Sequence, residues 1–210
     1  MTPRALGAAA VALAVVAAAC APTIDEPVAR WLGDREVWSG WDAGVRGLEY
    51  AGGIEPWVWT SVVVLGAGAI ATLAVPRWRG ASAAWLVVLG THALSRNVVS
   101  WTKLVTGRLR PVEWLATGGD AWLRDGGFSF PSGHVAWFAS LAVPIAVLVP
   151  RARVPLAIVI AFVMIARVAV GAHFISDTVA ALALECACTA LWLHVTRRLR
   201  AGSPPPASPR

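Results

Sequence analysis

The sequence predicts an all-α protein, an integral membrane helical bundle of about six transmembrane helices. Of its 210 residues, 57% are hydrophobic and only 14% are charged, which is too apolar for a soluble domain of this size. The apolar residues form continuous runs of about 18 to 22 residues, long enough to cross roughly 30 Å of hydrocarbon as helices. Strands are disfavoured because these runs do not alternate, and an open sheet cannot satisfy its backbone hydrogen bonds in lipid.

Five apolar runs predict membrane-spanning helices, near 56–75, 81–101, 133–150, 154–171 and 174–195, and an Ala-rich run at 5–21 predicts a sixth. The predicted organisation is a first transmembrane helix or signal-like segment at 1–22, an outward interfacial segment at 23–55, a membrane domain at 56–200 and a disordered cytoplasmic tail at 201–210. The first run could also be a cleaved signal peptide, or a lipoprotein signal that ends at Cys20. A retained helix is favoured because the run is long enough to span.

The protein has a net charge of +6, and its charged residues separate onto two sides of the membrane once the predicted spans are drawn. One side receives basic residues and no acidic ones, namely Arg4, Arg77, Arg79, Arg151, Arg153, Arg197, Arg198, Arg200 and Arg210. The other side receives the acidic 22–55 segment and the loop 112–131. By the positive-inside rule the basic side is cytoplasmic, so these two segments face outward. This segregation predicts membrane lipids as partners and argues against nucleic acid.

Two outward segments carry aromatic residues. Residues 24–50 place apolar side chains at three- and four-residue steps, which predicts an amphipathic helix on the outer membrane surface, although three glycines weaken it. A loop that is anchored by tryptophans and has no function is an equal alternative. The loop 112–131 is the only long connection between predicted spans, so it could cover a site.

The three cysteines predict neither a disulfide framework nor a metal site. Their number is odd, and Cys186 and Cys188 lie two positions apart inside the last predicted span, where they point to different faces. No His and Cys spacing typical of zinc is present. We expect small apolar helix residues here, with no metal and no cofactor in the protein.

Polar residues that could take part in catalysis or ligand binding lie at the ends of the predicted helices. They form three groups: Lys103 and Arg110 after the third span, Ser132, Gly133 and His134 at the start of the fourth, and Arg167, His173 and Asp177 around the turn between the fifth and sixth. With the topology above, all three groups fall at outward helix ends, so we expect them to converge in one pocket. Ionisable groups are costly in a bilayer, which makes these residues functional candidates.

These groups resemble the three-part signature of the type 2 phosphatidic acid phosphatase superfamily. KLVTGRLRP at 103–111, PSGH at 131–134 and ARVAVGAHFISD at 166–177 are similar to KxxxxxxRP, PSGH and SRxxxxxHxxxD. Ala166 stands where the strict pattern has Ser, which puts only a secondary phosphate contact in doubt. With the order and helical setting, the resemblance extends over about 80–200. It implies the helical core that this superfamily shares with haloperoxidases.

Cations and backbone amides at these positions suit a phosphoryl group, whose negative charge is spread over its oxygens. Lys103, Arg110 and Arg167 supply positive charge, and the arginines can bind two oxygens each. Pro131 suits the first position of a helix, and the free N–H groups of residues 132–134 would face an anion there. Phosphate binding is therefore predicted for Lys103, Arg110, Ser132, Gly133 and Arg167.

Three residues are predicted to be catalytic. His173 and Asp177 are four residues apart on one helical face, so the carboxylate can fix the imidazole tautomer and support its positive charge. His173 is the predicted nucleophile, as the resemblance also implies, and it would form a phosphohistidine. His134 would protonate the leaving oxygen and then activate water. Asp177 is the sole carboxylate of the motifs, too few for a two-metal site, so the phosphatase is predicted to be metal-independent.

The protein is predicted to be a lipid phosphate phosphatase. It is expected to be a multi-pass protein of the plasma membrane, with its active site facing the periplasm or exterior. Undecaprenyl pyrophosphate, phosphatidic acid and phosphatidylglycerophosphate all suit such a site, and we lean toward a prenyl pyrophosphate because the resemblance includes outward-facing recycling enzymes. A phosphatase of soluble phosphoesters is the alternative. A non-catalytic anion transporter is less favoured, because it needs polar residues through the whole membrane. A homo-oligomer is left open.

Four further polar residues have weaker assignments. His92 and Arg96 in the third span, and Glu185 in the sixth, are expected to make buried polar contacts between helices rather than to act directly in catalysis. Arg108 is an additional cation beside the site. We expect it to be a solvated flank.

Overall fold

The computed structural model describes residues 1–35, 40–52 and 60–201, and all of its regular structure is helical. The helices are α1 (Pro3–Thr23), α2 (Asp25–Gly33), α3 (Gly40–Gly52), α4 (Thr60–Ala74), α5 (Ser82–Thr106), α6 (Pro111–Thr117), α7 (Gly133–Leu148), α8 (Arg153–Ala169) and α9 (Ile175–Ala201). Short 3-10 turns at Pro76–Ala81 and Pro150–Ala152 precede α5 and α8. The predicted all-α class is confirmed.

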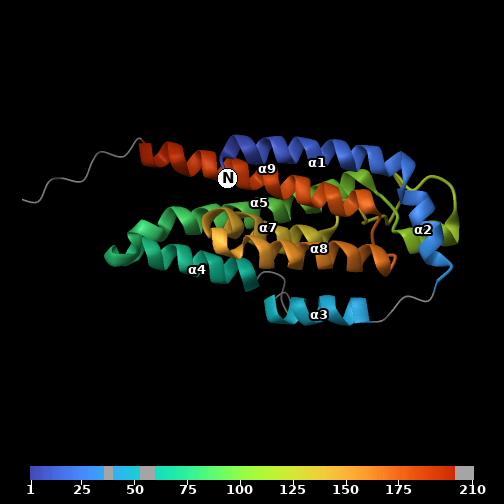
Figure 1. Cartoon of the computed structure of the whole chain (residues 1–210), viewed down its shortest axis with the longest axis horizontal. Coiled ribbons are helices and arrows are strands. Elements are labelled where there is room, and N and C mark those ends of the chain that lie inside the picture. Colours follow the sequence, from blue (N-terminus) through green and yellow to red (C-terminus); the bar gives the residue numbers. More distant parts are fainter. Residues whose placement is uncertain (36–39, 53–59, 202–210) are drawn as a thin grey trace, which may run out of the picture.

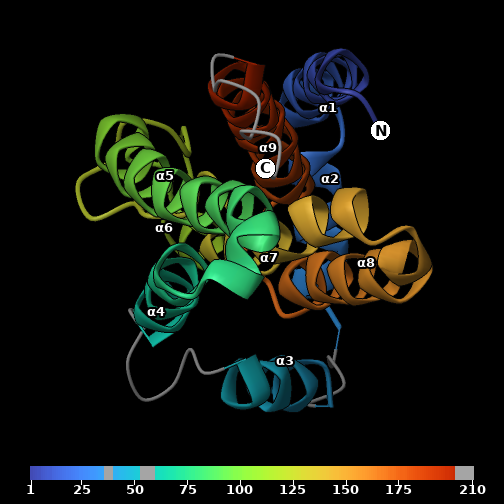
Figure 2. The same ribbon diagram turned by 90° about the vertical axis from the view of Figure 1, so that its left-hand side faces the viewer.

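The long helices run side by side along the length of the molecule, with α7 near the centre (Figures 1 and 2). Helix α7 packs on α5, α8 and α9, while α4 packs on α5 and α1 lies along α9. Small residues permit the close approach. Ala136, Ala139 and Ala181 are fully buried, and a Cβ on Gly90 of α5 would lie 2.2 Å from the Trp192 ring of α9.

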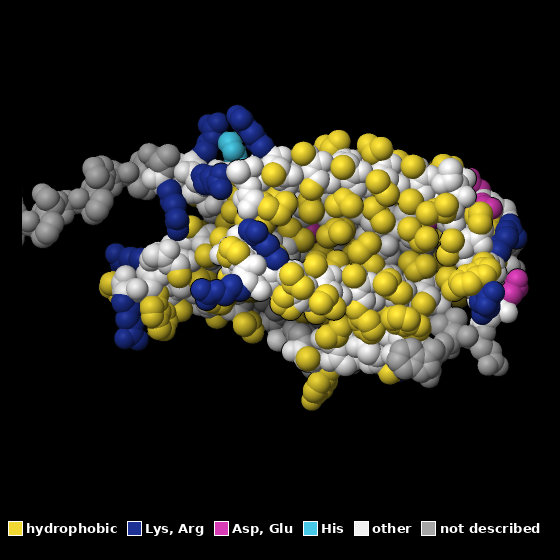
Figure 3. Space-filling view, viewed as in Figure 1, with side chains coloured by type: hydrophobic (Ala, Val, Ile, Leu, Met, Phe, Trp, Pro, Cys, Tyr) yellow, Lys and Arg dark blue, Asp and Glu magenta, His cyan; other side chains and the backbone are white. Residues whose placement is uncertain are grey.

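Three helical segments of the described chain are long and apolar enough to cross a membrane: Pro3–Thr23, Pro150–Ala169 and Ile175–Arg200. Thr60–Ala74 and Gly133–Leu148 are shorter apolar helices. Large apolar side chains cover the outside of the bundle, as Figure 3 shows, and they include Val11, Ile70, Ile158 and Leu191. Such a surface suits lipid better than water. The number of six spans stays a prediction.

The segment 24–50 differs from its prediction. Instead of one surface helix, α2 ends at Gly33 and α3 begins at Gly40, and the two helices have different partners. Helix α2 packs on α6, while α3 packs along α8, where Trp41 lies 5.6 Å from Phe162 between ring centroids. Residues 36–39 and 53–59, and the predicted tail from 202 onward, lie outside the described residues.

The end of the bundle that holds α2 and α6 positions the candidate site. Helix α5 ends at Thr106 and is capped by Gly107, whose φ of 49° is left-handed and whose N–H donates to the Lys103 carbonyl. A Cβ at Gly107 would lie 2.8 Å from the Arg124 carbonyl oxygen, so the chain turns sharply there into α6. The starts of α7 and α9 lie at this same end. On the face shown in Figure 3, most of the visible Lys and Arg side chains gather at the opposite end.

Candidate active site

The turn between α8 and α9 holds His173 against Asp177. The backbone N–H of His173 donates to the Arg167 carbonyl at 3.1 Å, and Asp177 in the first turn of α9 accepts the Phe174 N–H at 2.9 Å. His173 Nδ1 lies 3.5 Å from Asp177 Oδ2, with both side chains almost wholly buried. The contact made by Nδ1 leaves Nε2 as the ring nitrogen with a lone pair. The predicted pairing of these two residues is present.

Ser129 completes this pair, although no sequence pattern pointed to it. It lies in the loop before α7 and is fully buried. Its hydroxyl donates to Asp177 Oδ2 at 2.5 Å and lies 3.3 Å from His173 Nδ1. Its own N–H donates to the Arg108 carbonyl at 2.8 Å, which fixes the loop beside the histidine. The loop 112–131 therefore supports the site from within as well as bordering it.

Arg108 is not the solvated flank that we expected from the sequence. It is 2% exposed, and Nη1 donates to Asp177 Oδ1 at 2.5 Å while Nη2 donates to Asp25 Oδ2 at 2.7 Å. Its guanidinium also lies 4.2 Å from the ring centroids of Trp122 and Phe174. The expectation was wrong because Asp25, far away in sequence, brings a second carboxylate to the same point. Arg108 thus binds Oδ1 of Asp177, the oxygen that does not face His173, and it joins α2 to α9.

A cavity of about 220 Å³ brings together the residues that the three motifs contribute. Five predicted site residues line it, namely Lys103, Arg110, Gly133, His134 and His173. The other described residues that line it are Glu49, Arg96 and Trp137. The expected convergence at one end of the bundle is therefore present, with three cationic side chains and two imidazoles around one space. That space is large enough for a phosphate group.

Two predicted phosphate-binding residues are placed differently. Arg167 is not among the described residues that line this cavity, and its Nη1 lies 3.5 Å from Asp42 Oδ1 of α3. The N–H of Ser132 donates to the Asp177 carbonyl at 3.1 Å, so it is not free to face an anion as expected. The helix begins at Gly133 rather than at Pro131, which explains this difference. The Ser132 hydroxyl is buried without a hydrogen-bond partner among the described residues.

Glu49 of α3 belongs to the acidic 22–55 segment, and the sequence predicts no role for it in the site. In the structure its Oε1 contacts His134 Nε2, and the Glu49 side chain is 9% exposed. The second histidine of the cavity thus also has a carboxylate partner. No local spacing could show this, because α3 and α7 are far apart in the chain.

Burial sets the protonation state of His173. It lowers the pKa of His173 below the ordinary value of 6.5, and the positive charges of Lys103 and Arg167 act in the same direction, while Asp177 opposes them. The imidazole is therefore neutral at pH 7, the form that can act as a nucleophile.

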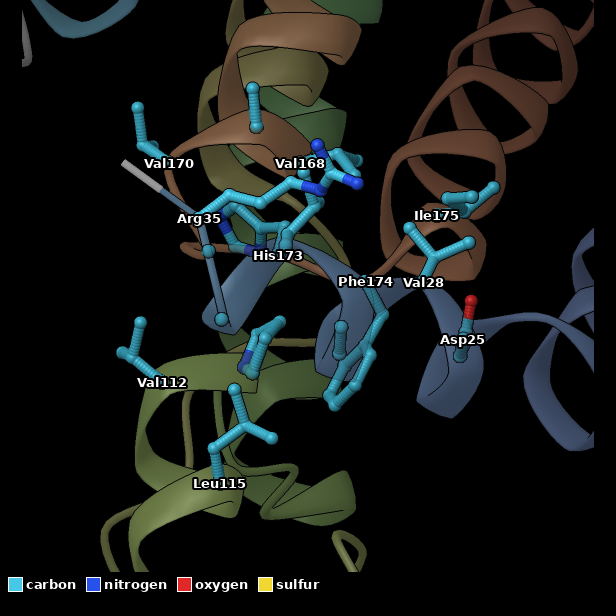
Figure 4. A pocket seen from close by; sticks show the side chains of 16 residues that line it. Asp25, Val28, Arg35, Val112, Leu115, Val168, Val170, His173, Phe174 and Ile175 are labelled. Atoms are coloured by element: carbon cyan, nitrogen blue, oxygen red, sulfur yellow. The ribbon is translucent and has the colours of Figure 1, made fainter. Parts of the chain in front are cut away.

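His173 also lines a second, largely apolar cavity of about 200 Å³ (Figure 4). Residues of α2, α6 and the α8–α9 turn line it, among them Val28, Leu115 and Phe174. His173 therefore belongs to the lining of both a charged cavity and an apolar one.

His92 and Glu185 form contacts between helices of the predicted kind, whereas Arg96, for which the same was expected, makes no side-chain hydrogen bond or ion pair with another described residue and lines the cavity instead. His92 contacts Ser61 and Ser140 at 2.7 Å each, which links α4, α5 and α7. Glu185 accepts from Ser95 at 2.5 Å and links α9 to α5. The described residues include no cluster of three or more His, Cys, Asp or Glu side chains that could hold a metal ion.

The fold and this cavity define a helical membrane protein in which two histidines and three cationic side chains surround one space. The PAP2 superfamily model matches residues 83–201, more than half of the chain, and the protein belongs to this superfamily. Membership supports phosphatase activity. Among solved structures, the chain is similar to the first transmembrane PAP2 type phosphatidylglycerolphosphate phosphatase from Bacillus subtilis, with 20% identity, a TM-score of 0.62, and coverage of 96% of this chain and 99% of that one. No curated protein sequence matches it.

Proposed function

We propose that this protein is an integral membrane lipid phosphate phosphatase that hydrolyses a phosphomonoester or a pyrophosphate through a phosphohistidine. The observation that carries the proposal is the cavity in which Lys103, Arg110, His134 and His173 meet. Its cations would stabilise the charge on the transferring phosphoryl oxygens, which is the main task of a phosphoryl-transfer site. Family membership supports the same class of reaction.

The mechanism starts with His173. Its Nε2 attacks the phosphorus while Nδ1–H faces Asp177, whose negative charge balances the positive charge that develops on the ring. In its protonated form, which the Glu49 carboxylate and a bound phosphate would stabilise, His134 gives its proton to the leaving oxygen as the P–O bond breaks. Water then attacks the phosphohistidine, returns a proton to His134 and releases orthophosphate. Glu49 is suited to orient the His134 ring during both steps.

A lipid substrate suits the position of the cavity. It lies at one end of an apolar bundle, so a headgroup can enter it while acyl or prenyl chains remain beside the helices. Basic side chains gather at the other end of the bundle (Figure 3), which favours a cytoplasmic location for that end and an outward-facing site in the plasma membrane.

The test is phosphate release by the purified protein from a panel of lipid phosphates, lipid pyrophosphates and water-soluble phosphoesters in detergent. We expect turnover of lipids to exceed that of soluble esters, and equal efficiency would favour the alternative of a soluble phosphoester phosphatase. His173→Ala should abolish release. His194→Ala is the matched control, because His194 is exposed at the far end of α9 and should be dispensable. Activity retained by His173→Ala would refute the assigned nucleophile.

Metal independence is tested separately. Because Lys103 and Arg110 supply the positive charge that metal ions supply in two-metal phosphatases, turnover should persist in excess chelator. Activity that is lost in chelator and restored by an added divalent cation would contradict this mechanism.

A further inference from the structure

The cavity extends beyond the residues that would bind the transferred phosphate. Arg96 and Trp137 line it together with the motif residues. Arg96 precedes Lys103 by seven residues, or about two turns of α5, so both lie on one face with Arg96 about 10 Å further from the α5 end. Trp137 follows His134 by one turn of α7. The cavity therefore has a catalytic end, at His173 and Arg110, and a deep end, at Arg96 and Trp137.

Both residues of the deep end have unused donors. Among the described residues, the Arg96 guanidinium has neither a hydrogen bond nor an ion pair; Glu185, the buried carboxylate of α9, is near enough to act on its charge but bonds to Ser95. Trp137 is 3% exposed, and its Nε1–H has no acceptor among the described residues. An arginine within a membrane bundle is costly unless an anion or a polar group accompanies it. These donors thus indicate a second negatively charged group in the cavity.

The direction of the cavity identifies which part of a substrate would lie there. A lipid whose terminal phosphate is at His173 must extend its chain toward the apolar length of the bundle, so the leaving group passes the deep end. From these observations we infer that Arg96 is a specificity-determining residue that binds a negative charge on the leaving group, and that it favours lipid diphosphates over lipid monophosphates. This inference rests on the proposed function.

The reaction of a diphosphate makes use of such a charge. The bond between His173 Nε2 and the terminal phosphorus forms while the bond from that phosphorus to the bridging oxygen breaks. His134 gives its proton to the bridging oxygen, and the inner phosphate keeps its own negative charge, so the lipid monophosphate leaves as an anion. Arg96 then faces a negative charge on the leaving group, whereas a monophosphate ester leaves as an alcohol without a charge near Arg96.

The experiment compares farnesyl diphosphate with farnesyl monophosphate, which share one chain and differ only in the inner phosphate. The full chain in detergent should show a higher kcat/KM for the diphosphate. Arg96→Gln should lower the ratio of the two kcat/KM values by about 10- to 100-fold, the loss expected for one charge-assisted contact, and Arg96→Lys should restore part of it. Arg79→Gln, an exposed arginine at the other end of the bundle, should leave the ratio unchanged. Lys103→Gln should reduce both activities alike.

An unchanged ratio in Arg96→Gln, or an equal loss on both substrates, would overturn the inference. The wild-type protein provides an independent measurement that does not depend on the folding of a variant. Inorganic pyrophosphate should inhibit farnesyl monophosphate hydrolysis more strongly than orthophosphate does, and equal inhibition would count against a second anion site. If the monophosphate is hydrolysed without a preference for the diphosphate, only this inference fails. If neither lipid releases phosphate, the proposed function fails.

Discussion

The two histidines of the cavity both contact a carboxylate, but the two pairs are built in different ways. His173 and Asp177 lie four residues apart at the start of α9, and Asp177 also accepts hydrogen bonds from Ser129, Phe174 and Arg108. His134 is 35% exposed in its side chain and meets Glu49, which α3 brings from a distant part of the chain. The first pair is fixed locally, whereas the second depends on how α3 docks against α8.

The largest loss of kcat is expected from a change in the His173–Asp177 pair. Asp177→Asn removes the charge that balances the developing imidazolium and changes the hydrogen bond to Nδ1, so kcat should fall by about 10³- to 10⁴-fold. Phosphate release measures it, with thermal unfolding in detergent as a check on folding. Asp125→Asn, in the exposed loop before α7, should have no effect. A loss below tenfold in Asp177→Asn would remove the basis for ranking the two pairs.

The contribution of Arg108, which binds Asp177, is tested by measuring the free energy of unfolding. Arg108→Leu would leave the buried carboxylates of Asp25 and Asp177 without their shared cation, which should cost about 3–5 kcal/mol of unfolding free energy. Arg30→Leu is the control, since its pair with Glu26 is exposed and spans 3.8 Å, and it should cost about 1 kcal/mol or less. Denaturant unfolding in detergent compares the two. Equal costs would show that burial of Arg108 does not govern its contribution.

A change in the His134–Glu49 pair should lower kcat by a smaller factor. Glu49→Gln keeps a hydrogen-bonding group near His134 but loses the carboxylate, so kcat should fall by about tenfold, less than the removal of a general acid itself. Glu26→Gln, at an exposed position of α2, is the matched control. If Glu49→Gln were as damaging as Asp177→Asn, the docking of α3 would be as essential as the turn that holds the nucleophile.

The pH profile should show the smallest change. Because burial lowers the pKa of His173 below 6.5, this histidine stays neutral at pH values where an exposed histidine is already half protonated. Protonation removes the nucleophilic lone pair, so kcat/KM should remain level through pH 6.5 and fall only at lower pH. A titration of kcat/KM against pH measures this. An acidic limb with its midpoint at or above 6.5 would contradict a buried nucleophile.

The sequence by itself determined the helical membrane class and the local part of the site. Continuous apolar runs require helices in lipid, and a four-residue spacing places Asp177 beside His173 whatever the rest of the chain does. Opposite helix directions also put Lys103, Arg110 and His134 at one end, where the structure has them. These inferences hold because helix geometry depends only on neighbouring residues.

Only the tertiary structure decided which side chains complete the site. Ser129, the contact between Glu49 and His134, and the place of Arg96 in the cavity depend on segments that are remote in sequence. Arg108 and Arg167 look alike in the sequence, yet one is buried between Asp25 and Asp177 and the other faces Asp42. Long cationic side chains can reach several partners, so their roles follow from where distant carboxylates pack, which local spacing does not encode.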